Sequence, residues 1–216
     1  MKYRGVLFDL DGTLLDTLQD IADSVNEALS SLGLSGHEVE AYKNFVGDGI
    51  DVLAVRALPD NHRDANTVTR LIGCLNENYS KRWAINTVLY HGVANLLDEL
   101  TIRNIKMAIL SNKPHEFTEV MVSTILSRWH FEAVVGNSSS VAKKPDPTAA
   151  LRITQQLVID PTEFLYLGDS GVDMKTAIAT NMYPVGALWG FRSAEELLSS
   201  GAKALIEYPN DLLAFL

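Results

Sequence analysis

Val6–Leu14 reads VLFDLDGTL, and this stretch decides how the chain is interpreted. Its first three residues form an apolar run typical of a short buried strand, and Asp9, Asp11 and Gly12 follow at once. Residues i and i+2 of a strand point the same way, so the two aspartates are expected to face one site where the chain leaves the sheet. Neighbouring carboxylates repel each other unless a cation or strong donors neutralise them. The stretch therefore predicts a hard divalent metal ion, with one carboxylate as nucleophile or ligand and the other free to handle protons.

The composition bounds the class of protein. The chain has 216 residues with 47% hydrophobic content, which is enough for one large domain or a core with a smaller insert. A net charge of −9 argues against general affinity for nucleic acid or an anionic membrane, yet a metal ion and a few lysines still allow a phosphate substrate. A single cysteine, Cys74, suits a reducing compartment. No segment has the length of a signal peptide or a membrane span, so we expect a soluble cytoplasmic protein.

Short apolar runs alternate with helical patterns along most of the chain. Helical spacing is clear in Val93, Leu96, Leu97 and Leu100. Uniformly apolar strands alternating with helices indicate a parallel sheet covered on both faces. The prediction is therefore an α/β fold with a Rossmann-like parallel sheet core. The expected strands are residues 6–8, 107–110, 133–135, 164–167 and 184–188, with 204–206 as a weaker sixth.

The segment from Thr17 to Tyr90 interrupts this alternation. It contains three helical patterns: residues 18–32, bounded by Asp16 or Thr17 and by Gly33; residues 50–57, ended by Pro59; and residues 68–79. No strand is expected there. The predicted domains are a Rossmann-like catalytic core of residues 1–16 and 91–216 and an inserted all-helical cap of residues 17–90.

Polar groups follow the predicted strands in turn. Functional residues of open α/β sheets collect at the carboxyl ends of the strands. Asp9 and Asp11 follow the first strand, Ser111–Lys113 the second, Lys143–Pro147 the third, and Gly168–Asp173 the fourth. Each group alone has an ordinary reading as a turn, a helix cap or a solvated charge pair. Their joint occurrence in this order favours an active site.

These residues resemble the signatures of the haloacid dehalogenase superfamily in its phosphatase form. Residues 9–17 are similar to the first signature, and Ser111, Lys144 and residues 168–173 match the other three in order. The resemblance covers essentially the whole chain. Further matches to the phosphoglycolate phosphatase branch are residues 46–49, 56–58, 143–147 and 190–192. The chain departs from that branch at His91, where proline is common, and at Asn137, where glycine is frequent.

The resemblance implies a mechanism. Asp9 would attack phosphorus to form an aspartyl phosphate, and Asp11 would act as the general acid and then the general base. Ser111 and Lys144 would bind the phosphoryl group. The cofactor would be Mg²⁺, held by Asp9, the backbone carbonyl of Asp11 and Asp169, with Asp173 holding a water ligand. Backbone groups near Gly12, Thr13 and Asn112 would complete the phosphate cradle.

The expected partner is a small phosphorylated metabolite such as 2-phosphoglycolate. Gly47, Asp48 and Gly49 are predicted to reach the leaving group from the cap, and Arg56 either pairs with a substrate carboxylate or lies on a helix surface. The open alternatives are a sugar-phosphate or nucleotide phosphatase, a β-phosphoglucomutase-like phosphomutase, and a phosphate-binding scaffold without activity. The sequence leaves the oligomeric state open between monomer and homodimer.

Overall fold

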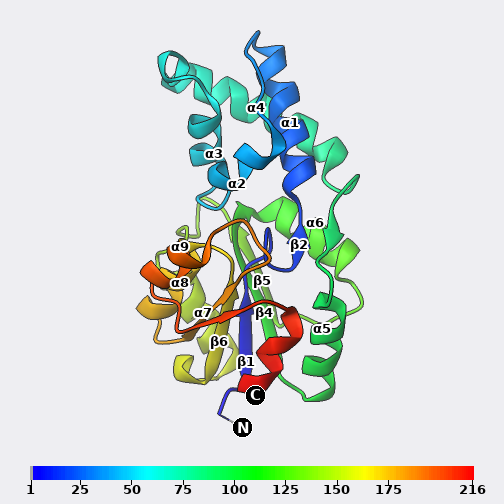
Figure 1. Ribbon diagram of the computed structural model, residues 1–216, viewed down its shortest axis with the longest axis vertical. Coiled ribbons are helices and arrows are strands. Elements are labelled where there is room, and N and C mark those ends of the chain that lie inside the picture. Colours follow the sequence, from blue (N-terminus) through cyan, green and yellow to red (C-terminus); the bar gives the residue numbers. More distant parts are fainter. Residues whose placement is uncertain (1) are drawn as a thin grey trace.

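The sheet predicted from the sequence is present. A computed structural model describes residues 2–216, and its six-stranded sheet has the order β5-β4-β1-β6-β7-β8 with every neighbouring pair parallel. Figure 1 shows this sheet at the end of the molecule that also holds both termini. The strands are β1 (Gly5–Phe8), β4 (Lys106–Pro114), β5 (Ala133–Asn137), β6 (Phe164–Gly168), β7 (Tyr183–Ala187) and β8 (Ala204–Ile206).

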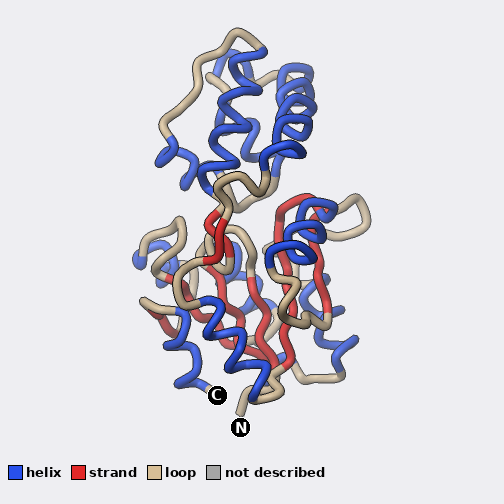
Figure 2. Tube along the Cα trace, turned by 90° about the vertical axis from the view of Figure 1, so that its right-hand side faces the viewer, coloured by secondary structure: helices blue, strands red, loops and turns tan. Residues whose placement is uncertain are grey.

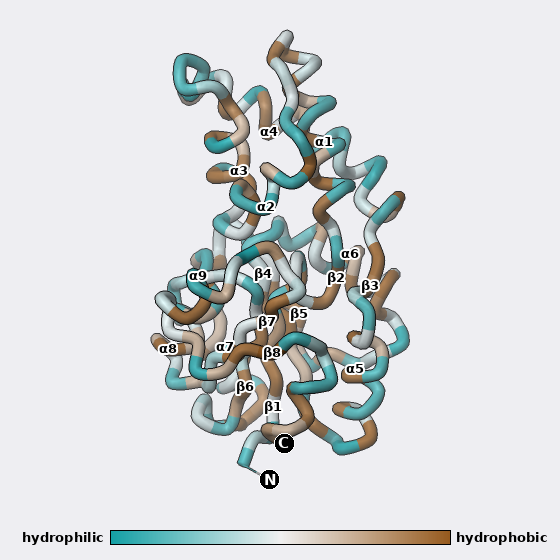
Figure 3. Tube along the Cα trace, viewed as in Figure 1, coloured by the Kyte–Doolittle hydropathy of each residue, from teal (hydrophilic) through white to brown (hydrophobic). Residues whose placement is uncertain are grey.

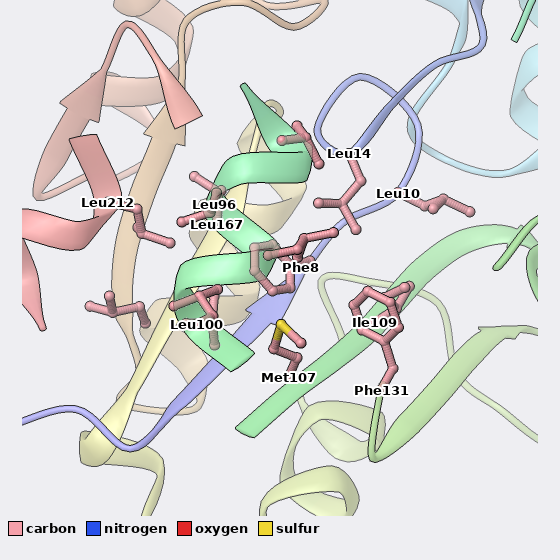
Figure 4. Packing of buried hydrophobic residues seen from close by; sticks show 14 of the residues in the cluster. Phe8, Leu10, Leu14, Leu96, Leu100, Met107, Ile109, Phe131, Leu167 and Leu212 are labelled. Atoms are coloured by element: carbon pink, nitrogen blue, oxygen red, sulfur yellow. The ribbon is translucent and has the colours of Figure 1, made fainter. Parts of the chain in front are cut away.

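Alternate residues of the central strand face two separate hydrophobic layers. Val6 and Phe8 pack with α5 (Val93–Ile102) and α6 (His115–Ile125), whereas Leu7 packs with α7 (Thr148–Leu157) and α8 (Gly171–Ala179). Figure 4 shows Phe8 packed beside Leu96 and Leu100 on the first face. Burial on both faces explains why the strands are uniformly apolar. Brown, hydrophobic segments accordingly follow the strands in Figure 3.

The chain between β1 and β4 forms a separate helical unit with its own core. Figure 2 shows this unit beyond one end of the sheet. Its helices are α1 (Leu18–Ser31), α2 (Tyr42–Phe45), α3 (Ile50–Ala57) and α4 (Ala65–Arg82), with short 3-10 turns at η1 (Val39–Ala41) and η2 (Asp60–His62). Val25 and Leu29 of α1 pack with Leu71 and Leu75 of α4, as their helical spacing predicted.

Local signals set the ends of these helices. After α1 the chain turns at Gly33, which has a φ of +74° that glycine adopts without strain. The carboxylate of Asp64 accepts from the backbone N–H groups of Asn66 and Thr67, both at 3.1 Å, and so caps α4. The remaining elements are η3 (Pro161–Glu163), α9 (Ala194–Ser199) and η4 (Pro209–Phe215).

The expectation of no strand between residues 17 and 90 was wrong. The strand β3 (Val88–Leu89) lies there and pairs antiparallel with β2 (Leu15–Asp16). Each strand has only two residues, which is too short for a periodic pattern to reveal. The pairing forms where the chain leaves the core and returns to it. Asp16 therefore belongs to a strand, although its carboxylate still accepts from the N–H of Leu18 at 3.3 Å.

The strand predicted at residues 107–110 also extends further than expected. β4 continues to Pro114, so Ser111, Asn112 and Lys113 belong to its last residues rather than to a following loop. None of the helices in residues 2–216 combines the length and apolar character needed to span a membrane.

Candidate active site

Asp9 lies buried at the carboxyl end of β1, the central strand. Its side chain is 8% exposed, and its Oδ1 lies 2.8 Å from the Nζ of Lys144. The backbone N–H of Leu10 donates to the same oxygen at 2.7 Å. The two contacts fix the carboxylate, and Lys144 balances its charge.

Lys144 comes from the segment after β5 and joins two carboxylates. Its Nζ donates to Asp173 Oδ1 at 2.7 Å in addition to contacting Asp9, and its side chain is 1% exposed. Burial lowers the pKa of Lys144, but the charges of Asp173 and Asp9 raise it further, so the pKa lies well above its usual range. Lys144 is therefore a permanent cation behind Asp9.

Asp9, Asp169 and Asp173 form a buried acidic cluster. Each offers a carboxylate oxygen, and the three oxygens lie within 4.8 Å of one another. Burial, followed by repulsion from Asp173, raises the pKa of Asp9 to about 7 despite Lys144. Burial and repulsion from Asp9 raise the pKa of Asp169 to about 8. Lys144 supplies one positive charge to three carboxylates. The remaining negative charge and the oxygen donors fit a hard divalent cation.

The turn after β6 places the last two of these carboxylates. Asp169 follows the strand directly, and Asp173 lies in the first turn of α8. Asp173 Oδ2 accepts from the N–H of Ser170 at 3.1 Å and completes a capping box, while its Oδ1 accepts from Lys144. The interpretation of Asp173 as a helix cap is thus correct, and the same side chain also faces the cluster.

Gly12 and Thr13 support Asp169. Thr13 Oγ1 donates to Asp169 Oδ1 at 3.1 Å, and the N–H of Phe191 donates to Asp169 Oδ2 at 2.8 Å. Gly12 has a φ of +82°, and a Cβ at this position would overlap the Asp169 carboxylate. Both residues lie beside the acidic cluster, as the sequence predicted, and the side-chain contact of Thr13 is with Asp169.

Asp11 is paired with a lysine that the sequence argument did not assign to the site. Lys113 Nζ donates to the two Asp11 oxygens at 3.0 and 3.1 Å. The same Nζ lies 4.6 Å from the centre of the Tyr79 ring in α4. Burial lowers the pKa of Lys113, but Asp11 and then Tyr79 raise it to a value above the usual range. Lys113 thus links a core carboxylate to the helical unit.

Ser111 and Asn112 lie at the same edge of the sheet. Ser111 is 4% exposed, and its Oγ accepts from the N–H of Lys113 at 3.2 Å. The side chain of Asn112 accepts from the backbone N–H of Lys144 at 2.8 Å and donates to the carbonyl of Gly47 at 3.0 Å. Asn112 therefore fixes the Lys144 backbone and contacts the helical unit.

A pocket lies between the acidic cluster and the helical unit. Its lining includes Asp9, Asp11, Ser111, Asn112, Lys113 and Asp169 from the core. The opposite wall is mostly apolar and includes Ile21, Ile50, Leu53, Leu75 and Tyr79, with Phe117 and Phe191 from the core beside them. The pocket therefore has a polar, acidic side on the core and a mostly apolar side on the helical unit.

The turn between α2 and α3 contributes Gly47 and Gly49 to the pocket lining. Their φ values are +117° and +97°, which a residue with a side chain adopts only with strain. Asp48 instead pairs with Arg56, with its Oδ2 2.6 Å from Arg56 Nη1. Among the described residues, Asp48 and Arg56 are not part of this lining.

Lys113, Tyr79 and Arg192 line the pocket with polar groups and were not assigned to the site from the sequence. Lys113 follows Ser111 and Asn112 at the end of a predicted strand, which was the available signal. Tyr79 reads as an apolar helix position. Arg192 follows Gly190 and Phe191 in the loop after β7, and only its place in a branch-specific match pointed to it. These three residues make contacts between segments that are distant in sequence, and such contacts leave no local pattern to detect.

Comparison with known proteins agrees with this architecture. Residues 6–187 match the family model described as haloacid dehalogenase-like hydrolase. A phosphoglycolate phosphatase of Pseudomonas putida is 31% identical over 217 residues, covering 99% of this chain and 78% of that protein. A phosphoglycolate phosphatase of Psychrobacter arcticus is also 31% identical, covering 91% of this chain and 88% of that protein.

The same similarity is found in three dimensions. The crystal structure of a Lactobacillus delbrueckii subsp. bulgaricus protein assigned as a phosphoglycolate phosphatase superposes with a TM-score of 0.91 at 28% identity. The superposition covers 98% of this chain and 97% of that one. The expected fold and family are therefore confirmed, and the chain belongs to the haloacid dehalogenase-like hydrolases.

Proposed function

We propose that this chain is a Mg²⁺-dependent phosphatase that hydrolyses a small phosphate monoester through an aspartyl phosphate on Asp9. The observation that carries the proposal is the Asp9 carboxylate, buried at the end of β1 between Lys144 and the Asp169–Asp173 pair. The named activity of the relatives supports a phosphate monoester, with 2-phosphoglycolate as the first candidate.

Asp9 is the nucleophile of the proposed reaction. An oxygen of its carboxylate attacks phosphorus, and the bond from phosphorus to the leaving alkoxide breaks. The contact with Lys144 at 2.8 Å orients the carboxylate and offsets the negative charge that gathers around phosphorus. Ser111 lines the pocket near the end of β4, and its hydroxyl would hydrogen-bond a phosphoryl oxygen.

Asp11 is the general acid and then the general base of the proposed reaction. It lines the same pocket two residues after Asp9, and Lys113 holds its carboxylate through both oxygens. In its protonated form Asp11 gives its proton to the leaving alkoxide, and the resulting carboxylate, held by Lys113, then takes a proton from the water that hydrolyses the aspartyl phosphate. The two aspartates therefore have different partners, Lys144 and Lys113, and different tasks.

Mg²⁺ would be held by carboxylate oxygens of Asp9 and Asp169 and by the backbone carbonyl of Asp11, with Asp173 next to them. When bound, the ion supplies positive charge to the phosphoryl oxygens and to the acidic cluster. The raised pKa values of Asp9 and Asp169 support this assignment, because they indicate carboxylates that lack sufficient positive charge.

We propose that residues 17–90 act as a cap that selects the leaving group, with residues 1–16 and 91–216 as the catalytic core. The turn with Gly47 and Gly49 lies over the site, and Asn112 donates to the Gly47 carbonyl. A closed cap excludes water and completes the binding surface.

Phosphate release by the purified protein tests this function. The panel is 2-phosphoglycolate, phenyl phosphate, sugar phosphates and nucleotides, with bisphosphorylated sugars included to detect transfer between positions. We expect release in Mg²⁺, none in chelator, and recovery when Mg²⁺ is restored. Release from no monoester in Mg²⁺ would contradict the proposal, as would full activity in chelator.

A further inference from the structure

Arg192 lies in a loop that is tied to the acidic cluster. The preceding residue, Phe191, donates from its N–H to Asp169 at 2.8 Å. A Cβ at Gly190 would overlap both Asp169 and the carbonyl of Gly12. This close packing fixes the loop against the site, and Arg192 itself belongs to the pocket lining.

The guanidinium of Arg192 reaches from the core to the cap. Its Nη2 donates to the carbonyl of Val46 at 2.7 Å, and its Nε lies 3.2 Å from Glu196 Oε1. A Cβ at Gly47 would lie 3.7 Å from Nη2, so the guanidinium sits beside the turn that reaches over the pocket. The side chain is 10% exposed.

Nη1 of Arg192 is buried and has no hydrogen-bond partner within residues 2–216. A buried donor without a partner is costly, so a group that accepts from it would be bound favourably. The lysines of the pocket region differ in this respect. Lys113 is bonded to both Asp11 oxygens, and Lys144 contacts Asp9 and Asp173.

We propose that Arg192 binds a carboxylate on the leaving group, so that the enzyme prefers phosphate monoesters carrying a carboxylate. The inference rests on the proposed phosphatase function. Asp9, Asp11 and Asp169 line the same pocket, so a substrate anion other than the phosphate needs a cation of its own. A guanidinium supplies a charge-assisted hydrogen bond to a carboxylate. Its apolar neighbours Val46 and Phe191 suit a single charge better than a second phosphate dianion.

The test compares 2-phosphoglycolate with 2-hydroxyethyl phosphate, which has similar size but no carboxylate. The measured quantity is the ratio of kcat/KM for the two esters. In Arg192→Gln this ratio should fall about 10- to 100-fold, mainly through KM for 2-phosphoglycolate, because a hydrogen bond between charged groups is lost. Arg192→Lys should retain part of the preference, since it keeps the charge but loses the planar fork.

Arg103→Gln is the matched control. Arg103 also has a glutamate four residues away and a backbone carbonyl as partner, with Nε 3.6 Å from Glu99 and Nη1 3.5 Å from the carbonyl of Leu213. It lies outside the pocket between core and cap. The kcat/KM ratio of Arg103→Gln for the two esters should equal that of the wild type. Thermal unfolding followed by circular dichroism checks that each variant is folded.

The outcomes separate this inference from the proposed function. A large fall in the ratio in Arg192→Gln and not in Arg103→Gln supports the inference. If Arg192→Gln lowers kcat/KM equally for both esters, Arg192 is only a contact between core and cap. If the kcat/KM ratio falls in Arg56→Gln and not in Arg192→Gln, Arg56 binds the carboxylate. Either result overturns the inference while phosphatase activity stands. Hydrolysis of neither ester nor of phenyl phosphate would overturn the proposed function itself.

Discussion

Lys113 holds Asp11 through both oxygens of the carboxylate, at 3.0 and 3.1 Å, and both side chains are almost fully buried. The lysine therefore restrains the group to which we assign proton transfer. It also contacts the Tyr79 ring of α4, so the position of the cap and the position of Asp11 depend on the same side chain.

Lys113→Met should lower kcat about 10- to 100-fold, because it removes a charged hydrogen-bond donor to Asp11 but keeps a flexible apolar stem. Lys113→Arg should lower kcat less than Lys113→Met does. Tyr79→Phe is the matched control, since it keeps the aromatic ring beside Nζ. The measurement is steady-state hydrolysis of phenyl phosphate in saturating Mg²⁺. A wild-type kcat in Lys113→Met would show that Asp11 needs no such restraint.

Mg²⁺ should stabilise the folded protein through the acidic cluster. An ion that binds only the folded state at 100 times its Kd adds about 2.7 kcal/mol. Asp169→Asn should abolish this rise in Tm.

The measurement is thermal unfolding in chelator and in Mg²⁺. Asp60→Asn serves as the control, since Asp60 is a carboxylate whose side chain is 90% exposed and pairs with Arg63. This variant should keep the Mg²⁺ shift of the wild type. An equal shift in Asp169→Asn would place the ion elsewhere.

Valine at Gly47 or Gly49 should change substrate preference. Both positions have positive φ in the turn that lines the pocket, so valine displaces the turn. We expect unequal losses of kcat/KM across several phosphate esters. Gly73→Val is the control, because a Cβ at Gly73 in α4 meets no atom within 4 Å. A uniform loss, or no loss, would argue against substrate selection by this turn.

Asp20 anchors the segment that returns from the cap. Its fully buried carboxylate accepts from the N–H and Nδ2 of Asn86 and from the N–H and Oγ1 of Thr87, at 2.8 to 3.0 Å. Asp20→Asn places an amide donor against these donors and should lower the free energy of unfolding by about 1–3 kcal/mol. Asp23→Asn in the same helix removes a pair with Arg82 in which the side chains are 30% and 31% exposed, and it should lower the free energy of unfolding by less than about 1 kcal/mol. Urea unfolding checks both, and equal costs would contradict this role of Asp20.

The sequence predicted the sheet and the groups at its edge because both depend on local signals. The run before Asp9 and the turn Gly168–Asp173 are short, contiguous patterns, and parallel strands bring their carboxyl ends together. Contacts between distant segments were not predictable in this way. Lys113 meets Tyr79, Asp20 meets Asn86, and Arg192 meets Val46, in each case across more than thirty residues of chain.

Arg56 illustrates the same limit. Its residue type suggested a partner for a substrate carboxylate, and only the structure shows its contact with Asp48, at 2.6 Å, and its place outside the pocket lining. The strands β2 and β3 were missed because each has only two residues, at the start and the end of the insertion. Two residues are too few to show a periodic pattern.

Trapping the phosphorylated protein tests the central claim most directly. Radiolabelled phenyl phosphate is mixed with the protein in Mg²⁺, the reaction is quenched in acid, and labelled peptides are identified by mass spectrometry. The wild type should carry label on Asp9 alone, and a sample of Asp9→Asn free of deamidation should carry none. Asp11→Asn should accumulate label on Asp9, because loss of the general base slows hydrolysis about 10²- to 10⁴-fold. Label on another residue, or turnover by Asp9→Asn at the wild-type rate, would contradict the account.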